Sequence, residues 1–364
     1  MDKVQYRSRK IAIVSHTLSG GGAERFSAVL GRMLDGLGYE IHHIVVNDAV
    51  DYAFAGTLFN LGKASAGQNI VSRKIGKGRL LKRYLDDAQI DTVIDNRSRN
   101  IWLREWLTKR IYGDRKKIYV VHSFKIDDYF PPFRWLARWL YADADAIVGV
   151  SQRIADEIQS KYGLTNTQVI YNPVEVTPTD AQNQNPNPDK YLLFLGRFDD
   201  KVKNFGLMLE AFALSGVHQQ GYRLLLMGSG PDEGLLKHQI QRLQLQDSIQ
   251  IVPFQSNPYT FLQNARFTLL TSRHEGFPMS LIESLALGVP VVSVDCPSGP
   301  SEIVQHEVNG LLVPNFDVAA LSDAIKRLAT DANLYDICKT NAMASVAHLS
   351  VESIGQQWQT MLEK

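Results

Sequence analysis

The chain has 364 residues, 45% of them hydrophobic, which is enough for two ordinary domains with their own cores. Its 39 Lys and Arg residues nearly balance 38 Asp and Glu residues, so a general nucleic-acid-binding protein, which needs a marked basic excess, is not expected. Only two cysteines occur, Cys296 and Cys338, and such sparse use favours a reduced, intracellular protein. At the N-terminus, basic residues precede Ser15 without a long apolar run, so no signal peptide is expected. No run of about 18 apolar residues occurs either, so we expect a cytoplasmic protein without a membrane span.

Short apolar runs alternate with helix-length amphipathic segments along the whole chain. In the first half, the runs that we interpret as strands are 11–15, 41–46, 91–95, 117–121, 146–150 and 167–171. In the second half they are 191–196, 223–228, 249–254, 266–271, 289–294 and 309–314. Continuous Val, Ile and Leu runs separated by helices are typical of parallel strands that are covered on both faces. The pattern predicts an α/β protein with two doubly wound, Rossmann-like domains.

A polar segment divides the two halves. Residues 174–189 contain prolines and almost no large apolar side chain, which is the composition of a linker. We therefore predict domains at 1–173 and 190–345. The remainder, 346–364, contains a predicted helix whose apolar stripe must pack on another part of the protein.

Three consecutive glycines follow the first predicted strand. Gly20, Gly21 and Gly22 lead into a helix that we expect to begin near Ala23. Glycines let a backbone approach a ligand closely, and the amides at a helix start attract anions. A tight turn without a ligand is the alternative. A dinucleotide-binding fingerprint would need a further glycine where the chain has Arg25, so a Rossmann dehydrogenase is disfavoured.

Two cations follow the strand at 191–196. Arg197 and Lys203 are six residues apart, and both can bind a diphosphate, arginine by its fork and lysine as a point charge. Solvated surface charge is the alternative. A further turn with Gly228 and Gly230 is interpreted as a simple β–α connection.

The stretch HEGFPMSLIESLALGVP, 274–290, places two glutamates around the start of a predicted helix from about Met279 to Leu287. The backbone amides near its start carry partial positive charge that suits a phosphate or a sugar oxygen. A carboxylate would repel a phosphate, so Glu275 and Glu283 are predicted to accept hydrogen bonds from hydroxyls of a sugar and a ribose. A solvated glutamate near a helix start is the alternative for either residue alone.

Together these segments resemble the signature of family four glycosyltransferases, which are retaining enzymes with the GT-B fold. EGFPMSLIE followed by SLALGVPVVS resembles the family's Glu–seven residues–Glu motif, and GRFDDKVKN resembles its diphosphate-binding segment. SGGGAER resembles the N-terminal glycine loop, and VVHSF places His122 where the family keeps an active-site histidine. The resemblance covers essentially the whole chain, with four motifs in the family's order.

The resemblance implies two domains facing a cleft, with a nucleotide sugar, expected to be UDP-linked, as co-substrate and no other cofactor. It implies that 1–173 binds the acceptor, that 190–345 binds the donor, and that the C-terminal helix of 346–364 packs back on the first domain. It implies that Arg197 and Lys203 neutralise the departing diphosphate, that Glu283 binds the ribose, and that His122 lies beside the transferred sugar. The residues implied in catalysis are His122, Glu275, Arg197 and Lys203. The residues implied in donor binding are Gly21, Gly22, Arg197, Lys203, Phe254, Glu275, Gly276, Phe277, Pro278, Met279, Ser280 and Glu283.

No metal site is expected. Asp143 and Asp145 have the spacing of a metal-binding Asp-x-Asp motif, but they precede a predicted strand and so lie at its amino end, opposite the expected ligand edge. Arg197 and Lys203 can replace a metal ion as counter-charge for a diphosphate.

Three segments of the first half combine basic and aromatic residues: 71–85, 99–117 and 130–141. Such segments can lie on an anionic membrane surface or bind a lipid-linked pyrophosphate. Helices that pack their tryptophans inward and solvate their charges are the alternative. SGGGAER also resembles members that extend lipid-linked oligosaccharide, lipopolysaccharide or capsule.

The sequence thus predicts a retaining, metal-independent transferase of a hexose or N-acetylhexosamine. The expected acceptor is a hydroxyl of a glycan, lipid-linked, in cell-surface polysaccharide or glycoconjugate synthesis. The enzyme would lie in the cytoplasm or peripherally on the inner face of the cell membrane. A nucleotide-sugar epimerase or hydrolase of the same fold and a non-catalytic nucleotide- or glycan-binding module are the alternatives.

Overall fold

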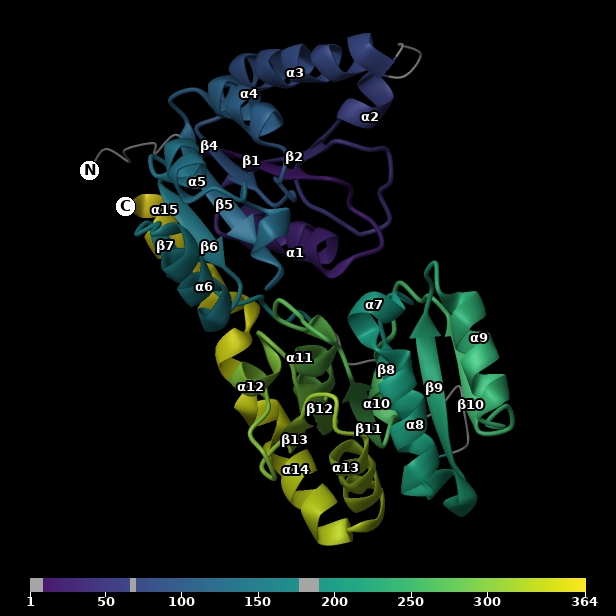
Figure 1. The fold of residues 1–364 in the computed structure, drawn as a ribbon. Coiled ribbons are helices and arrows are strands. Elements are labelled where there is room, and N and C mark those ends of the chain that lie inside the picture. Colours follow the sequence, from purple (N-terminus) through teal and green to yellow (C-terminus); the bar gives the residue numbers. More distant parts are fainter. Residues whose placement is uncertain (1–8, 66–69, 177–189) are drawn as a thin grey trace, which may run out of the picture. The chain divides into compact units, whose positions relative to one another are not determined.

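The computed structural model describes residues 9–65, 70–176 and 190–364 (Figure 1). The chain divides into two compact units, unit 1 with Met1–Pro173 and Val351–Lys364, and unit 2 with Val174–Ser350. Residues 177–189, most of the predicted linker, lie outside the described residues. Unit 2 extends five residues beyond the predicted domain end at 345, and the backbone N–H of Val174 donates to the Leu349 carbonyl at 2.8 Å in that extension.

Unit 1 is built on a seven-stranded parallel sheet in the order β3-β2-β1-β4-β5-β6-β7. Its strands are β1 (Lys10–Ser15), β2 (Glu40–Val45), β3 (Thr57–Asn60), β4 (Thr92–Asp95), β5 (Lys116–Val121), β6 (Ala146–Gly149) and β7 (Thr167–Val169). All six runs that the sequence predicted as strands are present. The sequence did not predict β3, a four-residue edge strand whose side chains are only half-buried, so it lacks the apolar run that marks the others.

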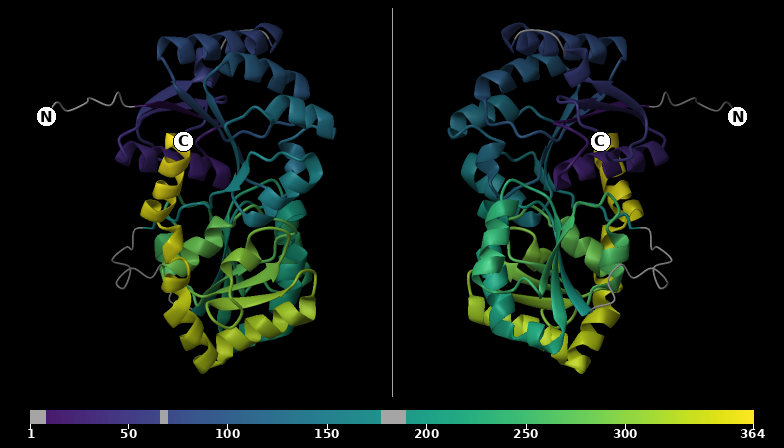
Figure 2. Two further views of the ribbon diagram at one scale, coloured as in Figure 1. Left: turned by 90° about the vertical axis from the view of Figure 1, so that its left-hand side faces the viewer. Right: turned by 90° about the vertical axis from the view of Figure 1, so that its right-hand side faces the viewer.

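The helices of unit 1 are α1 (Gly22–Gly36), α2 (Leu61–Ala64), α3 (Ile70–Asp87), α4 (Trp102–Tyr112), α5 (Arg134–Tyr141), α6 (Gln152–Tyr162) and α15 (Val351–Glu363). Although α15 ends the chain, it runs beside α1 (Figures 1 and 2). Its Trp358 is fully buried, with the ring centroid 6.3 Å from that of Phe26. The Lys116 ammonium donates to the carbonyls of Met361 and Leu362 at 3.0 and 2.9 Å, where the last carbonyls of a helix favour a cation.

Unit 2 has a six-stranded parallel sheet in the order β10-β9-β8-β11-β12-β13. Its strands are β8 (Lys190–Leu195), β9 (Tyr222–Gly228), β10 (Ile249–Pro253), β11 (Phe267–Leu270), β12 (Val291–Asp295) and β13 (Gly310–Pro314). Its helices are α7 (Asp200–Lys203), α8 (Phe205–Ser215), α9 (Glu233–Arg242), α10 (Tyr259–Asn264), α11 (Met279–Ala286), α12 (Pro300–Ile303), α13 (Val318–Thr330) and α14 (Ala332–Ser345). The six predicted strands of this half are all present, so the predicted doubly wound α/β class is confirmed.

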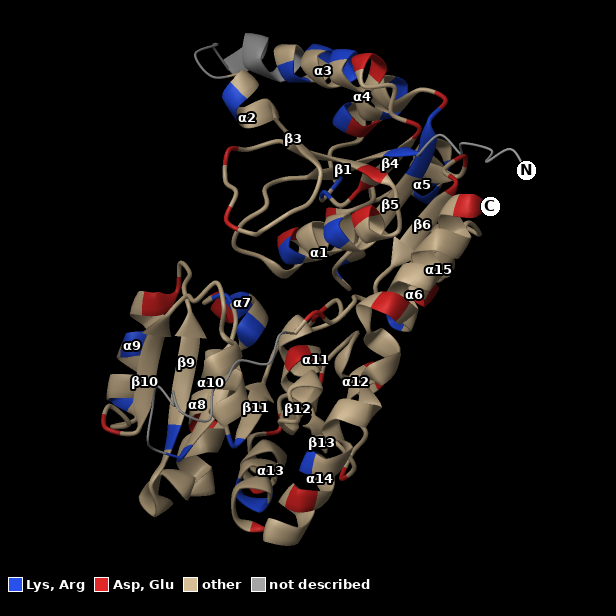
Figure 3. Cartoon of the chain, turned by 180° about the vertical axis from the view of Figure 1, so that it is seen from behind, with Lys and Arg blue, Asp and Glu red and all other residues tan. Residues whose placement is uncertain are grey.

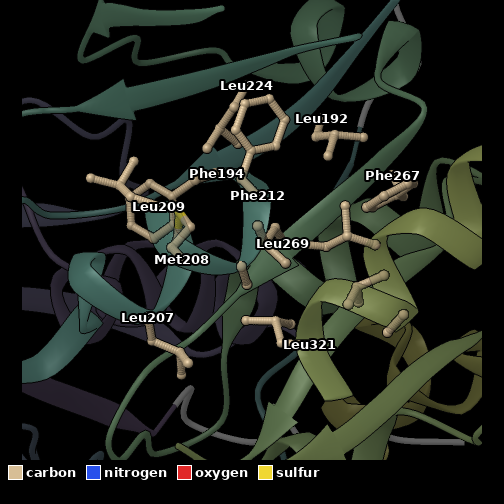
Figure 4. Packing of buried hydrophobic residues seen from close by; sticks show 14 of the residues in the cluster. Leu192, Phe194, Leu207, Met208, Leu209, Phe212, Leu224, Phe267, Leu269 and Leu321 are labelled. Carbon is tan, nitrogen blue, oxygen red and sulfur yellow. The ribbon is translucent and has the colours of Figure 1, made fainter. Parts of the chain in front are cut away.

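The larger of the two buried hydrophobic clusters of unit 2 lies between the sheet and the helices α8 and α13 (Figure 4). Helix α8 has almost no polar face, and its Phe205 and Phe212 are buried against the sheet. The Phe194 and Phe205 rings meet edge to face with centroids 5.2 Å apart. Close packing of this kind holds the carboxyl ends of the strands rigidly, and those ends carry the candidate site.

Each sheet has one point where the strand order reverses. In unit 1, β1 lies between β2 and β4, and in unit 2, β8 lies between β9 and β11. In open parallel sheets, ligands bind beyond the carboxyl ends of the strands at such points. The loops that follow β1 and β4, and those that follow β8 and β11, are therefore where a site is expected.

Candidate functional site

An ion pair joins the two loops at the reversal point of unit 2. Lys203 ends α7, and its Nζ donates to Oε1 of Glu275 at 2.6 Å. The hydroxyl of Ser272 donates to the same oxygen at 2.5 Å. Both charged side chains are mostly buried, with 15% and 14% of their surfaces exposed. The sequence placed these residues on different parts of a donor; the structure brings them into direct contact.

Further hydrogen bonds tie the loop after β11 to α7. The Thr271 hydroxyl donates to the carbonyl of Lys203 at 2.8 Å, and the Arg273 backbone N–H donates to the carbonyl of Val202 at 2.7 Å. The Arg273 guanidinium also donates to Oδ1 of Asn204 at 2.7 Å. Asn204 has a φ of +54°, a left-handed conformation that asparagine tolerates better than most residues. These contacts fix where the Lys203 side chain begins.

The start of α11 is braced by the loop after β12. Ser298 Oγ donates to the carbonyl of Gly276 at 2.7 Å, and the Glu275 N–H donates to the carbonyl of Pro297 at 3.2 Å. Gly299 has a φ of +97°, and a Cβ there would lie 2.5 Å from Cδ of Pro278. The sequence prediction missed this brace, although CPSGP at 296–300 has the composition of a tight turn. The brace holds Gly276, Phe277 and Pro278, which the resemblance implies in donor binding, in one conformation.

Helix α11 begins at Met279, as the sequence predicted, and Pro278 is its N-cap. The first amides of a helix have no intrahelical acceptor, so those of Met279 and Ser280 are electropositive donors at this edge. Glu283 lies in the second turn of α11 and is 1% exposed. The alternative reading of Glu283 as a solvated charge is therefore wrong.

Two further predicted donor-binding side chains follow β8 and β10, which are separated in the sheet by β9. Arg197 follows β8, is exposed, and makes no hydrogen bond or ion pair through its side chain with the described part of the chain. Phe254 follows β10 and is 41% exposed. A Cβ on Gly228 would lie 1.9 Å from the carbonyl oxygen of Gly196, so this glycine lets β9 end directly against the segment that carries Arg197. That contact supports the interpretation of Gly228 as part of a turn.

In unit 1, the glycine loop forms the start of α1. The helix begins at Gly22, Gly21 is its N-cap, and Gly20 has a φ of +82°. The carboxylate of Glu24 folds back over this start, because a Cβ on Gly21 would lie 2.3 Å from Oε2 of Glu24. A carboxylate is stabilised at a helix N-terminus for the same reason that a phosphate is. Any side chain at position 21 would displace it.

A chain of hydrogen bonds connects α1 to His122, which follows β5. Ser27 Oγ donates its one proton to the carbonyl of Ala23 at 3.0 Å, so it accepts from Nδ2 of Asn96 at 2.9 Å. The oxygen of the Asn96 amide therefore faces His122, and Nε2 of that ring lies 3.3 Å from it. Nε2 carries the ring proton in this arrangement, and Nδ1 is left as an acceptor.

The surroundings of His122 keep its ring neutral. Burial and, secondarily, the nearby Arg99 guanidinium lower the pKa of His122 to about 3. The Phe26 ring packs against it edge to face, with centroids 4.8 Å apart. At neutral pH, His122 is a hydrogen-bonding group rather than a cation. Asn96, which orients it, was not predicted from the sequence.

A buried charge network supports the loop after β4. Arg97 donates to the Asp95 carboxylate through Nε and Nη2 at 2.9 and 2.6 Å, and the Tyr112 hydroxyl donates to it at 2.8 Å. Burial alone would raise the pKa of Asp95, but the Arg97 guanidinium holds it at about 2. The fully buried Arg99 donates to the carbonyls of Asp95 and Val120 at 2.9 and 3.2 Å. The sequence prediction did not include this network. The segment NRSRN at 96–100, polar and directly after a buried strand at the reversal point, could have indicated it.

Comparison with known proteins identifies the family. Residues 20–177 match the family model of Glycosyltransferase Family 4, and residues 176–344 match that of Glycosyl transferases group 1. The chain belongs to the family 4 (group 1) glycosyltransferases. This glycosyltransferase is 23% identical over 359 residues to the amylovoran biosynthesis glycosyltransferase AmsD of Erwinia amylovora. The aligned residues cover 97% of the chain and 99% of the relative.

A second relative is the N-acetylgalactosamine-N,N'-diacetylbacillosaminyl-diphospho-undecaprenol 4-alpha-N-acetylgalactosaminyltransferase of Campylobacter jejuni. It is 27% identical over 351 residues, which cover 92% of the chain and 94% of the relative. Among solved structures, a mutant of S. aureus TarM in complex with fondaparinux, α-GlcNAc-glycerol and UDP has a TM-score of 0.80 at 13% identity, covering 98% of this chain and all of that one. Anabaena HepE with UDP and glucose has a TM-score of 0.77 at 17% identity, with 98% and 99% covered. These neighbours share the GT-B fold, which the sequence predicted.

The two aspartates with metal-motif spacing have structural partners in this glycosyltransferase. Asp145 directly precedes β6, and its Oδ2 accepts from the backbone N–H of Lys117 at 2.7 Å. Asp143 accepts from the Lys109 ammonium at 2.7 Å. Across residues 9–65, 70–176 and 190–364, no group of three or more His, Cys, Asp or Glu side chains is arranged to hold a metal ion. In the same residues, no helix is both long enough and apolar enough to cross a bilayer.

Proposed function

We propose that this glycosyltransferase moves a hexose or N-acetylhexosamine from a UDP-sugar to a hydroxyl of a lipid-linked glycan, with retention of configuration and without a metal ion. The observation that carries the proposal is the Lys203–Glu275 pair beside the electropositive start of α11. The loops after β8 and β11 thus bring together a cation that can bind phosphate, helix-start amides that can bind phosphate or sugar oxygens, and a carboxylate that can bind hydroxyls.

The cations of this site would bind the diphosphate of the donor, and its carboxylates would bind the hydroxyls. Lys203 has three N–H donors and uses one on Glu275, so the others are available to a diphosphate. Arg197 would add a forked contact to the same diphosphate. Glu275 and Glu283 would accept from sugar and ribose hydroxyls, the segment Gly276–Ser280 would line the sugar, and Phe254 would lie near the base.

Catalysis would rest on charge stabilisation and orientation. Negative charge develops on the leaving diphosphate, where Arg197 and Lys203 stabilise it more strongly in the transition state than in the bound donor. The acceptor hydroxyl would attack the face that the nucleotide leaves. His122 would accept a hydrogen bond from a hydroxyl of the transferred sugar, and Gly21 and Gly22 would allow close approach of the α1 start. No covalent nucleophile is assigned.

The acceptor and location follow from relatives. The name of the Campylobacter relative specifies a diphospho-undecaprenol-linked acceptor, and that of the E. amylovora relative specifies amylovoran biosynthesis. UDP is present in both structural neighbours described above. These names support a UDP-sugar donor and a lipid-linked acceptor in cell-surface polysaccharide or glycoconjugate synthesis. The proposed reaction would take place at the inner face of a membrane.

The test begins with a panel of nucleotide sugars in thermal-shift assays, because a donor that binds only the folded chain raises its melting temperature. The donor that binds is then incubated with and without undecaprenyl-diphosphate-linked glycans, and the product linkage is read by NMR. Retention of configuration and dependence on the acceptor are expected. Donor consumption that is equally fast without acceptor would instead indicate a hydrolase or epimerase, and binding without turnover would indicate a binding module.

Arg197→Gln provides the variant for this test, and Arg242→Gln at the end of α9 is its matched control. Removal of a charge-assisted phosphate contact is expected to lower kcat/KM on the order of 10²-fold. The control, whose arginine only pairs at 3.8 Å with Glu210 on the surface, is expected to retain the parent rate.

A further inference from the structure

Helix α4 has the reverse of the usual amphipathic arrangement. Its buried side chains include Glu105, Thr108 and Tyr112, which are polar or bear a hydroxyl. Its exposed side chains include Trp102, at 51%, and Leu107, at 48%. A surface helix in water normally buries its apolar stripe and solvates its polar one. A helix arranged the other way round is suited to an outer surface that meets something apolar.

Helix α5 adds tryptophans and arginines to the same region. Leu136 and Leu140 face inward, while Trp135 and Trp139 are 69% and 52% exposed. The two tryptophans are four residues apart, so they share one face, and Arg134 and Arg138 form a parallel exposed row beside them. No acidic residue occurs between Asp128 and Asp143.

The two helices adjoin within unit 1. Lys109 on α4 donates from Nζ to the carbonyl of Trp139 on α5 at 2.9 Å. Trp106 and Arg110 of α4 stack, with the guanidinium carbon 3.9 Å from the ring centroid. Figure 3 shows Lys and Arg along α3, α4 and α5. The apolar patch comprises Ile101, Trp102, Leu103, Leu107, Phe133, Trp135 and Trp139.

This patch is concentrated on one region of the protein. Seven of the fifteen large hydrophobic side chains that are exposed among the described residues belong to it, so it is not the scattered apolar exposure of an ordinary surface. The sequence left open whether these tryptophans pack inward. The structure excludes that for Trp102, Trp135 and Trp139.

We infer that the apolar patch inserts into the interfacial layer of a bilayer that contains anionic lipid, with Arg134 and Arg138 against the headgroup phosphates. Tryptophans favour this layer because their rings are apolar and their N–H groups can remain hydrated. Cations beside them add attraction to anionic headgroups. The inference deepens the proposed function, since a lipid-linked acceptor is presented at such a surface.

The charges on α5 favour a bilayer over a second copy of the chain. In a two-fold symmetric interface the patch would meet itself. Arg134 and Arg138 of each copy would then face those of the other, with no acidic residue on α5 to compensate. Like charges brought together in this way disfavour association. Anionic headgroups complement both the rings and the guanidinium groups.

The test uses the full chain with phosphatidylcholine vesicles, with and without phosphatidylglycerol, and with lipids brominated on their acyl chains. The parent is expected to float with the anionic vesicles, and its tryptophan fluorescence is expected to shift to the blue and to be quenched by the bromolipid. Trp135→Ala with Trp139→Ala is expected to weaken vesicle binding at least about ten-fold, since two interfacial anchors are lost. Arg134→Gln with Arg138→Gln should reduce the preference for anionic vesicles, with the remainder supplied by the cations of α4.

Leu214→Ala with Met343→Ala, at positions 63% and 60% exposed in unit 2, is the matched control and should bind as the parent does. Equal vesicle binding by the tryptophan variant, or parent binding without bromolipid quenching, would overturn the inference. So would a parent dimer by light scattering that becomes monomeric in the tryptophan variant. The quenching measurement needs no variant, so it stands even if a substituted chain folds poorly. A thermal shift with UDP reports the donor site separately, and its failure would count against the proposed function alone.

Discussion

At the scale of single residues, the orientation of one amide decides what His122 can do. Asn96 directs its oxygen to His122 because Ser27 accepts from its nitrogen. Asn96→Asp replaces that amide by a carboxylate, which favours an imidazolium and should raise the pKa of His122 by about one to two units. Because the parent pKa is about 3, the ring should stay neutral near pH 7 and transfer there should change little, whereas the acid limb of the pH profile should move to higher pH.

Titration of the His122 Cε1 proton by NMR measures this effect alongside the pH profile of kcat/KM. Asn100→Asp places the same charge at an exposed position of the same loop and should leave both unchanged. A His122 titration that is identical in the parent and in Asn96→Asp would show that the hydrogen-bond chain does not set the state of the ring.

Single and double variants of the Lys203–Glu275 pair can distinguish its contribution to stability from its contribution to donor binding. Lys203→Met leaves the Glu275 carboxylate, which is 14% exposed, without its cation and should cost about 2–3 kcal/mol of unfolding free energy. Adding Glu275→Gln removes the stranded charge, so stability should largely return while affinity for UDP does not. Urea denaturation and UDP titration measure the two quantities. Recovery of UDP affinity in the double variant would mean that Lys203 does not contact the diphosphate.

At the scale of elements, the α11 start depends on a loop that contributes no predicted ligand contact. Gly299→Ala forces a side chain into a left-handed conformation and against Pro278, so it should cost about 1–3 kcal/mol and weaken UDP binding. Gly234→Ala, in the first turn of α9 with open space around its Cβ, should be neutral or stabilise by up to about 1 kcal/mol. Unchanged UDP affinity in Gly299→Ala would show that the brace is not needed for the site.

Strand β2 and helix α1 together enclose a second neutral histidine. His43 is fully buried, and burial together with Arg32 lowers its pKa to about 4. The unfolded chain binds a proton there below about pH 6.5 and the folded chain does not, so stability is complete above that pH and is lost as pH falls toward 4.

Between pH 7 and pH 5 this histidine should account for about 2 kcal/mol of lost stability. His43→Leu should therefore flatten the pH dependence of urea unfolding by that amount. His238→Gln, on the exposed face of α9, should not. An unchanged slope in His43→Leu would assign the acid sensitivity to other groups.

At the scale of the whole molecule, the sequence predicted the buried strands, which recur along the chain as apolar runs. Strands buried on both faces appear as continuous apolar runs, so twelve of them were located and only the half-buried edge strand β3 was missed. Contacts between loops leave no such periodic signal. The Asn96–His122 contact joins residues 26 positions apart, and the Lys203–Glu275 contact joins residues 72 positions apart. Only the strand order brings these residues together.

The strand order also indicates which groups could supply positive charge to the leaving diphosphate. Asp145 lies at the amino end of β6, bonded to the backbone of Lys117, and Asp143 pairs with Lys109. Arg197 and Lys203 follow β8 at the carboxyl edge, so under the proposed function they, rather than these aspartates, would meet the phosphates of the donor. Transfer should therefore proceed at the same rate in EDTA as with added Mg²⁺ or Mn²⁺.

Asp143→Asn should retain the parent kcat, whereas Lys203→Met should lose it in every buffer. A rate abolished by EDTA and restored by Mg²⁺ would assign the counter-charge to a metal ion and leave Lys203 with the structural role of neutralising Glu275.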